Sequence, residues 1–127
     1  MIISRGNIYM ADIPIVENSS VQGGIRPVVV VQNDIGNAHA PIVQVIPLTS
    51  QSKHNLPVHI KIYGYGLAKE STLLTEQIQT IDQKNLGRYL GHVDDDTMQE
   101  INKCIAVQLG LIPIYNHRKG VFQMSDY

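Results

Sequence analysis

The residues best suited to chemistry flank a predicted pair of strands. Arg26 comes just before Val28–Val31, a β-branched run that is typical of a buried strand. Thr49 follows a second apolar run, Ile42–Ile46, and the polar residues 32–37 between the two runs favour a turn. If these strands are neighbours, Arg26 and Thr49 lie at the same end of the pair. A cation and a hydroxyl brought together in this way can hold a phosphate group.

Three histidines and one acidic cluster offer alternative chemistry. His39 and His54 fall in polar turns, where solvated histidines are common, whereas His59 lies on a predicted strand. Asp94–Asp96 resembles a metal-binding cluster, but it opens the longest predicted helix, where acidic residues serve as caps. No group of His, Cys and Asp has the spacing of metal ligands. The sequence therefore predicts neither a metal nor another cofactor.

Short strands dominate the predicted secondary structure. Pro14 ends the first strand, and the long loop of residues 15–24 that follows is rich in Ser, Asn and Gly, as functional loops often are. Pro57 before the fourth strand favours an edge position, because proline lacks the N–H that a central strand needs. A helical turn is predicted at residues 83–86. The predicted strands cover residues 5–12, 28–31, 42–46, 58–62, 71–82 (with a bend midway) and 89–93.

One long helix is predicted over Asp94–Leu109. Asp96 and Gln99 have the spacing of a capping pair, and Gly110 is expected to end the helix. Many short strands followed by one helix indicate a small, mainly β domain, and the pattern leaves open whether the sheet closes into a barrel. The helical spacing predicts a core-facing stripe of Met98, Ile101, Ile105 and Leu109.

Composition limits the class of protein. The 127 residues fit one domain, predicted over residues 1–113, with a polar, partly disordered tail over 114–127. A net charge of −1 argues against a general nucleic-acid binder, so any such contact must come from a few local groups. Cys104 is the only cysteine, which excludes an intrachain disulfide and fits a reducing cytoplasm. No signal-peptide pattern and no membrane-length apolar run is present, which predicts a cytoplasmic protein.

Several motifs recur in the order of a known family. The segments QGGIRPVVVVQND, PLTSQ, LPVHIKI, YGLAKESTLLTEQIQTID and LGLI together run from about Arg5 to Ile112. This sequence resembles the MazF/PemK family of toxin endoribonucleases from type II toxin–antitoxin pairs. The resemblance implies a fold that is mainly β with α, an SH3-like small β-barrel of the CcdB/PemK-like toxin class with a C-terminal helix.

The resemblance also implies a function and a set of site residues. It implies an mRNA interferase, a sequence-specific and ribosome-independent endoribonuclease that cleaves single-stranded RNA without metal to 2′,3′-cyclic phosphate and 5′-OH ends. Arg26 of the G-x-R-P motif and Thr49 of the T-S-Q motif would be catalytic. An arginine side chain has a pKa above about 12, which favours charge stabilisation over proton transfer as the role of Arg26. Residues placed at the substrate are Ser20, Gln22, Gly23, Gly24, Asn33, Ser50, Gln51, His59, Glu76, Gln77 and Gln79.

Residue 79 departs from the family, whose members usually carry Arg where this chain has Gln. The family further implies a homodimer and a cognate MazE-like antitoxin with a disordered acidic tail. DNA would be bound only through the antitoxin complex, and no membrane is involved. Two alternatives remain at this level. One is a CcdB-like toxin that poisons a topoisomerase by binding, and the other is an SH3-like peptide-binding module, which an aromatic content of 6% without Trp disfavours.

Overall fold

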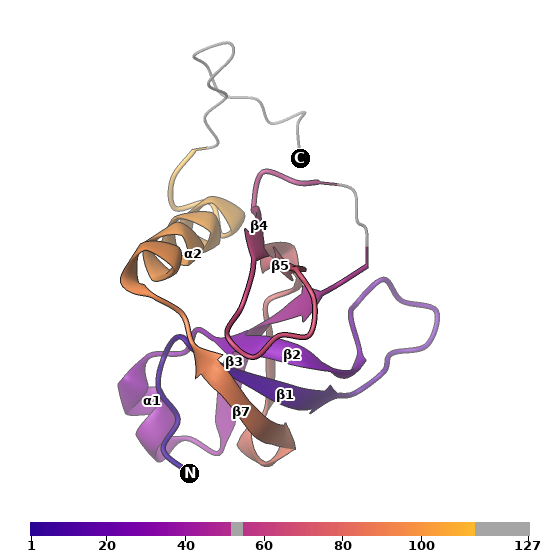
Figure 1. Cartoon of the computed structure of the whole chain (residues 1–127), viewed down its shortest axis with the longest axis vertical. Coiled ribbons are helices and arrows are strands. Elements are labelled where there is room, and N and C mark those ends of the chain that lie inside the picture. Colours follow the sequence, from indigo (N-terminus) through magenta and orange to yellow (C-terminus); the bar gives the residue numbers. More distant parts are fainter. Residues whose placement is uncertain (52–54, 114–127) are drawn as a thin grey trace.

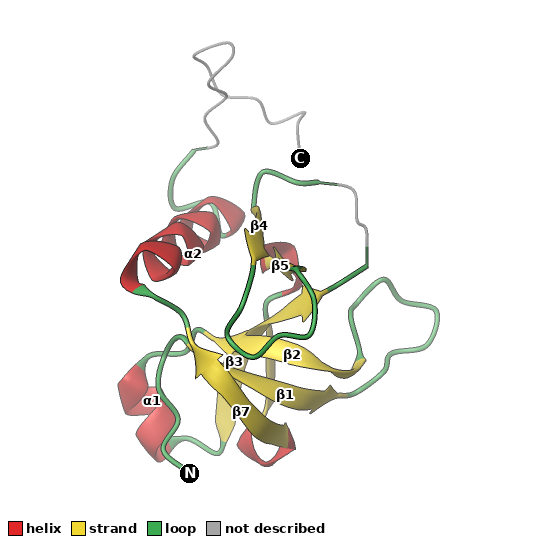
Figure 2. Cartoon of the chain, viewed as in Figure 1, coloured by secondary structure: helices red, strands yellow, loops and turns green. Residues whose placement is uncertain are grey.

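The structure is a computed structural model that describes residues 1–51 and 55–113. These residues form seven strands, two α-helices and two 3₁₀ segments (Figure 2). His54 and the predicted tail lie outside the described residues. The elements in chain order are β1 (Asn7–Ile13), β2 (Gly24–Val30), α1 (Asp34–His39), β3 (Ile42–Thr49), β4 (His59–Ile62), β5 (Ser71–Leu74), η1 (Thr75–Gln77), β6 (Gln79–Asp82), η2 (Gln83–Asn85), β7 (Leu86–His92) and α2 (Asp95–Gln108).

All strand pairings are antiparallel, and the strand order is β4-β5-β3-β2-β1-β7, with β6 also paired to β3. The first half of β3 pairs with β6 and its last two residues pair with β5, so β3 passes from one part of the sheet to the other (Figure 1). The predicted mainly β fold with a C-terminal helix is confirmed. β4 lies at a sheet edge, as Pro57 predicted.

Two hydrophobic clusters fill the two faces of the central strands. Val28 and Val30 of β2 belong to the first cluster, whereas Val29 and Val31 belong to the second. Successive side chains of a strand point to opposite faces, so a strand covered on both sides reads as an unbroken apolar run. Full burial of one such side chain contributes about 1.5–3 kcal/mol. The second cluster includes Ile101 of α2, so the helix covers this face of the sheet.

The segment predicted as a polar turn is a helix, so this prediction was wrong. α1 begins after Asn33, whose Oδ1 accepts a hydrogen bond from Gly36 N at 2.8 Å. The side chain of Asn37 is buried and donates to Gln32 O at 3.0 Å. Asn, Asp and Gly favour turns, but Asn and Asp also favour helix N-caps, so their presence did not separate the two outcomes.

The predicted strand over 71–82 is divided by η1 into β5 and β6. The bend falls in the predicted region, and the expected helical turn after β6 is present as η2. β7 begins at Leu86, three residues earlier than predicted. The bend carries Glu76 and Gln77, two of the predicted site residues, out of the strand and into η1.

The long helix was placed within one residue of its actual limits. Asp94 is the N-cap, and its Oδ1 accepts from Thr97 N at 2.7 Å. The capping pair predicted between Asp96 and Gln99 was therefore wrong, because the helix is capped two residues earlier. Leu109, predicted to face the core, is 58% exposed at the C-cap. In the described ranges no helix is long and apolar enough to cross a membrane.

Candidate active site

The strand register places the two proposed catalytic residues at the same end of the β2–β3 pair. Val28 pairs with Pro47 and Val30 with Val45 between β2 and β3. Arg26 lies two residues before Val28 and Thr49 lies two residues after Pro47, so both lie beyond the same end of this ladder. The structure therefore places both residues at one end of the strand pair, as the sequence predicted.

Arg26 is half-buried, and its orientation is fixed by one hydrogen bond. Its Nε–H donates to Gly23 O at 3.1 Å. This contact uses one of the five N–H donors of a guanidinium and defines the plane of the other four. The planar fork of donors that remains matches the geometry of a phosphate group.

Thr49 is only 5% exposed, and its Oγ1 accepts a hydrogen bond from Gln51 N at 3.2 Å. A hydroxyl that accepts from a backbone N–H keeps its own hydrogen for donation to another group. Ser50 and Gln51 follow it at the surface. The turn after β3 thus holds the Thr49 hydroxyl in place.

The loop before Arg26 is held by hydrogen bonds from two glutamines, Gln77 of η1 and Gln79 of β6. Gln77 Oε1 accepts from Gln22 N at 3.2 Å, and Gln77 Nε2 donates to Ser20 O at 3.2 Å. Gln79 Nε2 donates to Gln22 O at 3.4 Å and to Gln77 O at 3.2 Å. These four predicted residues are therefore brought together. They hold the backbone that leads into Gly23, the hydrogen-bond partner of Arg26.

Two glycines let the loop close tightly beside Arg26. A Cβ at residue 23 would lie 2.8 Å from Ile15 Cα and 2.9 Å from Pro14 O, which no side chain allows. Gly24 has a φ of 88°, in the left-handed region that glycine adopts freely. The roles predicted for these glycines in bringing backbone close to a substrate stay predictions. The conformation of the loop itself requires glycine at both positions.

His59 and Glu76 bind each other. His59 Nε2 lies 2.9 Å from Glu76 Oε2 and 3.0 Å from Oε1, with the imidazole 5% and the carboxylate side chain 22% exposed. His59 Nδ1 accepts from Leu56 N at 3.2 Å, which leaves the ring hydrogen on Nε2 to donate to Glu76. Both ring nitrogens are thus engaged within the protein. The Glu76 carboxylate is therefore bound by His59, and the pair joins β4 to η1.

Asn33 is not brought to this end of the molecule. It caps α1 beyond the far end of β2, while Arg26 lies near the start of that strand. Arg26 and Val30 are four residue steps apart along the strand, a distance of about 13 Å. Figure 1 shows the loop between β1 and β2 at one end of the strand pair and α1 at the other.

Two polar residues that the sequence did not single out extend the row that begins with Arg26 and Thr49. Thr49 pairs with Thr72 of β5, and Thr72 pairs in turn with Lys61 of β4. Thr49, Thr72 and Lys61 therefore lie side by side across β3, β5 and β4 on one face, and Arg26 lies at the adjoining end of β2. Lys61 alternates with apolar neighbours in its strand, but that pattern does not reveal which residues lie opposite it. Among the residues described, no three or more His, Cys, Asp or Glu side chains form a possible metal site.

Comparison with solved structures places the fold among toxins of the CcdB/PemK-like class. The structure of an endoribonuclease in complex with its cognate antitoxin, from a mycobacterial species, aligns with a TM-score of 0.71 at 27% identity. The alignment covers 87% of this chain and 97% of that chain. The barrel and C-terminal helix that the resemblance implied are those of this class.

The chain belongs to the family of PemK-like, MazF-like toxins of type II toxin–antitoxin systems, which matches residues 4–109. The chain is 43% identical over 116 residues to the endoribonuclease EndoA of Bacillus subtilis strain 168, covering 88% of this chain and 98% of that protein. It is also 43% identical over 117 residues to the endoribonuclease MazF of Staphylococcus saprophyticus, covering 90% and 97%. These findings do not favour the alternative of a CcdB-like topoisomerase poison.

Proposed function

We propose that this toxin is an endoribonuclease that cuts single-stranded RNA at a specific sequence, independently of the ribosome and without a metal ion. The activity itself is supported by family membership and by the two relatives named endoribonucleases. The observation that carries the chemistry is the oriented, half-buried Arg26 at the strand end that also holds the Thr49 hydroxyl. This pair can bind one phosphate group of an RNA backbone.

The reaction is attack of a ribose 2′-oxygen on the adjacent phosphorus. The 2′-O–P bond forms while the P–O5′ bond breaks, one proton leaves the 2′-hydroxyl, and one proton reaches the departing 5′-oxygen. The products are a 2′,3′-cyclic phosphate and a free 5′-OH, so no water enters this step. Arg26 stabilises the negative charge that develops on the phosphorane, and Thr49 donates to a non-bridging oxygen.

The loop tied by Gln77 and Gln79 has a supporting role in this mechanism. It fixes Gly23 O, which in turn orients the guanidinium of Arg26. Preorganised donors stabilise a transition state because they need no rearrangement while the charge develops. We therefore assign Gln77 and Gln79 to the positioning of Arg26, in addition to the substrate contacts predicted for them.

The partners follow from the family and from one relative. The mycobacterial endoribonuclease was solved with its cognate antitoxin, and we propose that this chain has an antitoxin of its own. A homodimer, an acidic disordered tail on the antitoxin, DNA binding only through the antitoxin complex, and a cytoplasmic location stay predictions.

Cleavage of a long RNA in EDTA tests the proposal. We expect cuts at one short sequence, ends that accept a 5′ label from polynucleotide kinase without prior phosphatase treatment, and loss of cleavage when the ribose at the cut carries no 2′-OH. Activity that disappears in EDTA and returns with Mg²⁺ would overturn the metal-free mechanism. Ends with a 5′-phosphate would overturn attack by the 2′-oxygen, and an uncut RNA would overturn the activity.

A further inference from the structure

A polar cavity of about 410 Å³ opens beside Thr49. Its volume lies within the range of about 300–1,000 Å³ that is typical of ligand pockets. Hydroxyl, amide and charged groups line it, in contrast to the largely apolar lining of most small-molecule sites. The lining includes Ser50, Gln51, Lys61, Lys69, Glu70 and Thr72.

The cavity is lined by the chain and strand neighbours of the proposed catalytic Thr49. Ser50 and Gln51 follow Thr49 in the chain, and Thr72 is the strand partner of Thr49. Lys61 lies one strand further, opposite Thr72. With strands about 4.8 Å apart, the paired residues Thr49, Thr72 and Lys61 span about 10 Å. A chain held by its phosphate at Arg26 and Thr49 can therefore extend into this cavity.

The cavity carries cationic groups that can bind a phosphate and polar groups that can bind a base edge. Lys61 Nζ lies 3.3 Å from Glu70 Oε1 in an ion pair at the surface, where the two side chains are 57% and 42% exposed. Two lysines and one carboxylate give the lining a net charge of +1. The pairing of Lys61 leaves Lys69 as the better candidate for a backbone phosphate. Glu70 and the amide of Gln51 can accept or donate hydrogen bonds at a base edge.

We propose that this cavity binds a nucleotide of the RNA that flanks the scissile phosphate, with Lys69 on its backbone phosphate and Glu70 facing its base. This inference rests on the proposed function and specifies its substrate site. The carboxylate argues for RNA over a purely anionic ligand, because it accepts hydrogen bonds from base amino groups and repels extra phosphate.

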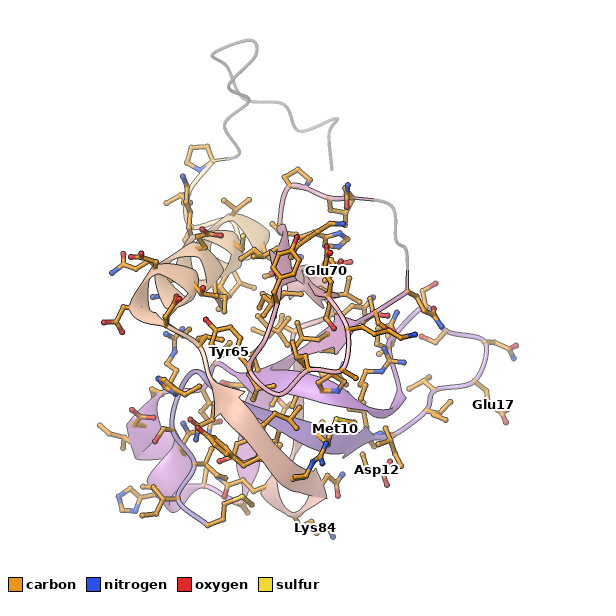
Figure 3. The ribbon with its side chains drawn as sticks, in the orientation of Figure 1. Met10, Asp12, Glu17, Tyr65, Glu70 and Lys84 are labelled. Atoms are coloured by element: carbon orange, nitrogen blue, oxygen red, sulfur yellow. The ribbon has the colours of Figure 1, made fainter. Side chains whose placement is uncertain are left out.

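Two lysine-to-methionine variants test the phosphate contact. Lys69→Met removes one of the two lysine charges of the cavity. Lys84→Met removes an exposed lysine of η2, which lies far from the cavity. Figure 3 shows Glu70 beside β5 and Lys84 at the opposite end of the molecule. The probe is an RNA oligonucleotide with the mapped cut site and a 2′-deoxyribose at the cut, whose binding is measured by fluorescence anisotropy over a range of KCl concentrations.

We expect Lys69→Met to raise the Kd about tenfold, because the variant loses a charge-assisted hydrogen bond to the phosphate. The slope of log K against log salt should fall by about 0.7, the value for one contact to a single strand. Lys84→Met should change neither quantity. Equal Kd and slope in both variants, with unchanged melting temperatures, would overturn the cavity as a nucleotide site.

Glu70→Gln tests the base contact separately. The wild-type protein should discriminate between oligonucleotides that differ in one base next to the cut, and Glu70→Gln should reduce this discrimination about tenfold or more, as expected for loss of a good base contact. Unchanged discrimination at every flanking base would overturn the role of Glu70. If the wild-type protein does not cut RNA at all, the proposed function fails first. If it cuts while all three variants bind and discriminate alike, only the cavity fails.

Discussion

The two ends of the β2–β3 pair carry similar polar side chains and use them in opposite ways. At the α1 end, Gln32 Nε2 donates to Asn37 Oδ1 at 3.2 Å, and Arg5 Nε donates to Val31 O at 2.7 Å. At the other end, Arg26 and Thr49 each make one hydrogen bond that orients the group and leaves further hydrogens for a ligand. The α1 end is a closed polar network, and the Arg26 end is an open one.

This difference separates polar residues that stabilise the fold from polar residues that are available to bind a ligand. Closed networks satisfy buried polar groups and fix a single conformation. At the α1 end, hydrogen bonds from the Arg5 backbone N–H and from Asn37 hold the pKa of Asp34 below its usual value of 3.8. The stability gained from this lowered pKa is present at neutral pH and is lost as the pH falls through the folded-state pKa of Asp34. The open end has donors without such a closed set of partners, as binding requires.

Substitution at the open end should produce the largest effect on catalysis. Arg26→Lys keeps the charge but loses the planar fork, and Thr49→Val keeps the shape but loses the hydroxyl. We expect each to lower the cleavage rate by about 10²–10³, the cost of removing one preorganised donor in a comparable site. Cleavage rate and melting temperature should be measured together. A large fall in melting temperature would show that these residues belong to the scaffold.

Substitution at the closed end should reduce stability and leave the chemistry intact. Asn37→Ala removes three hydrogen bonds, to Gln32 O, Gln32 Nε2 and Asp34 Oδ1. We expect a loss of about 1–3 kcal/mol in the free energy of unfolding, since buried polar partners lose their contacts. Urea unfolding measures this loss. An unchanged midpoint, or a cleavage rate that falls while the protein is still folded, would contradict the division between the two ends.

The sequence predicted those elements in which burial dictates residue type. The unbroken apolar run at Val28–Val31 and the periodic helix after Asp94 were readable because burial dictates residue type there. The location of Arg26 and Thr49 at one end of the strand pair followed from an antiparallel neighbour relation alone. Lys61 was not recognised as part of the row, because its place there depends on pairings set by the long connections around β4.

The closed contact of His59 with Glu76 was also beyond the sequence. Histidine and glutamate form both catalytic and structural pairs, and here burial and the Leu56 N–H to Nδ1 bond indicate a structural pair. The helix α1 was missed for a similar reason, since Asn33 begins a turn and a helix with the same side-chain contact. Local patterns specified the elements, while the partners of polar groups required the folded chain.

Loosening the loop should produce an intermediate effect on cleavage. Gln77→Leu removes the bonds to Gln22 N and Ser20 O, so Gly23 O should hold Arg26 less firmly. We expect kcat to fall about tenfold, which corresponds to about 1.4 kcal/mol, the scale of a single net hydrogen bond. Gln77→Glu keeps the acceptor for Gln22 N and should fall less. A change in KM alone would show that Gln77 contacts substrate and does not position Arg26.

The smallest effect is expected at Gln79, the position at which the family resemblance predicts an arginine. Gln79 is half-buried and donates to two carbonyls, Gln22 O and Gln77 O. Arginine can replace both bonds, because its five N–H donors exceed the two that the loop accepts, and the remaining donors carry a positive charge toward the substrate side of the loop.

Gln79→Arg should therefore leave the melting temperature unchanged and tighten binding of uncleavable RNA a few-fold. The salt slope should steepen by about 0.7, the value for one added phosphate contact on a single strand. Gln79→Leu, which removes both loop bonds and adds no charge, separates the two roles of this position, since it should lower kcat without changing the slope. If the affinity, the salt slope and the cut-site sequence of Gln79→Arg all equal those of the wild type, residue 79 acts only on the loop. Gln79 would then have a structural role only, like the residues of the closed polar network at the α1 end.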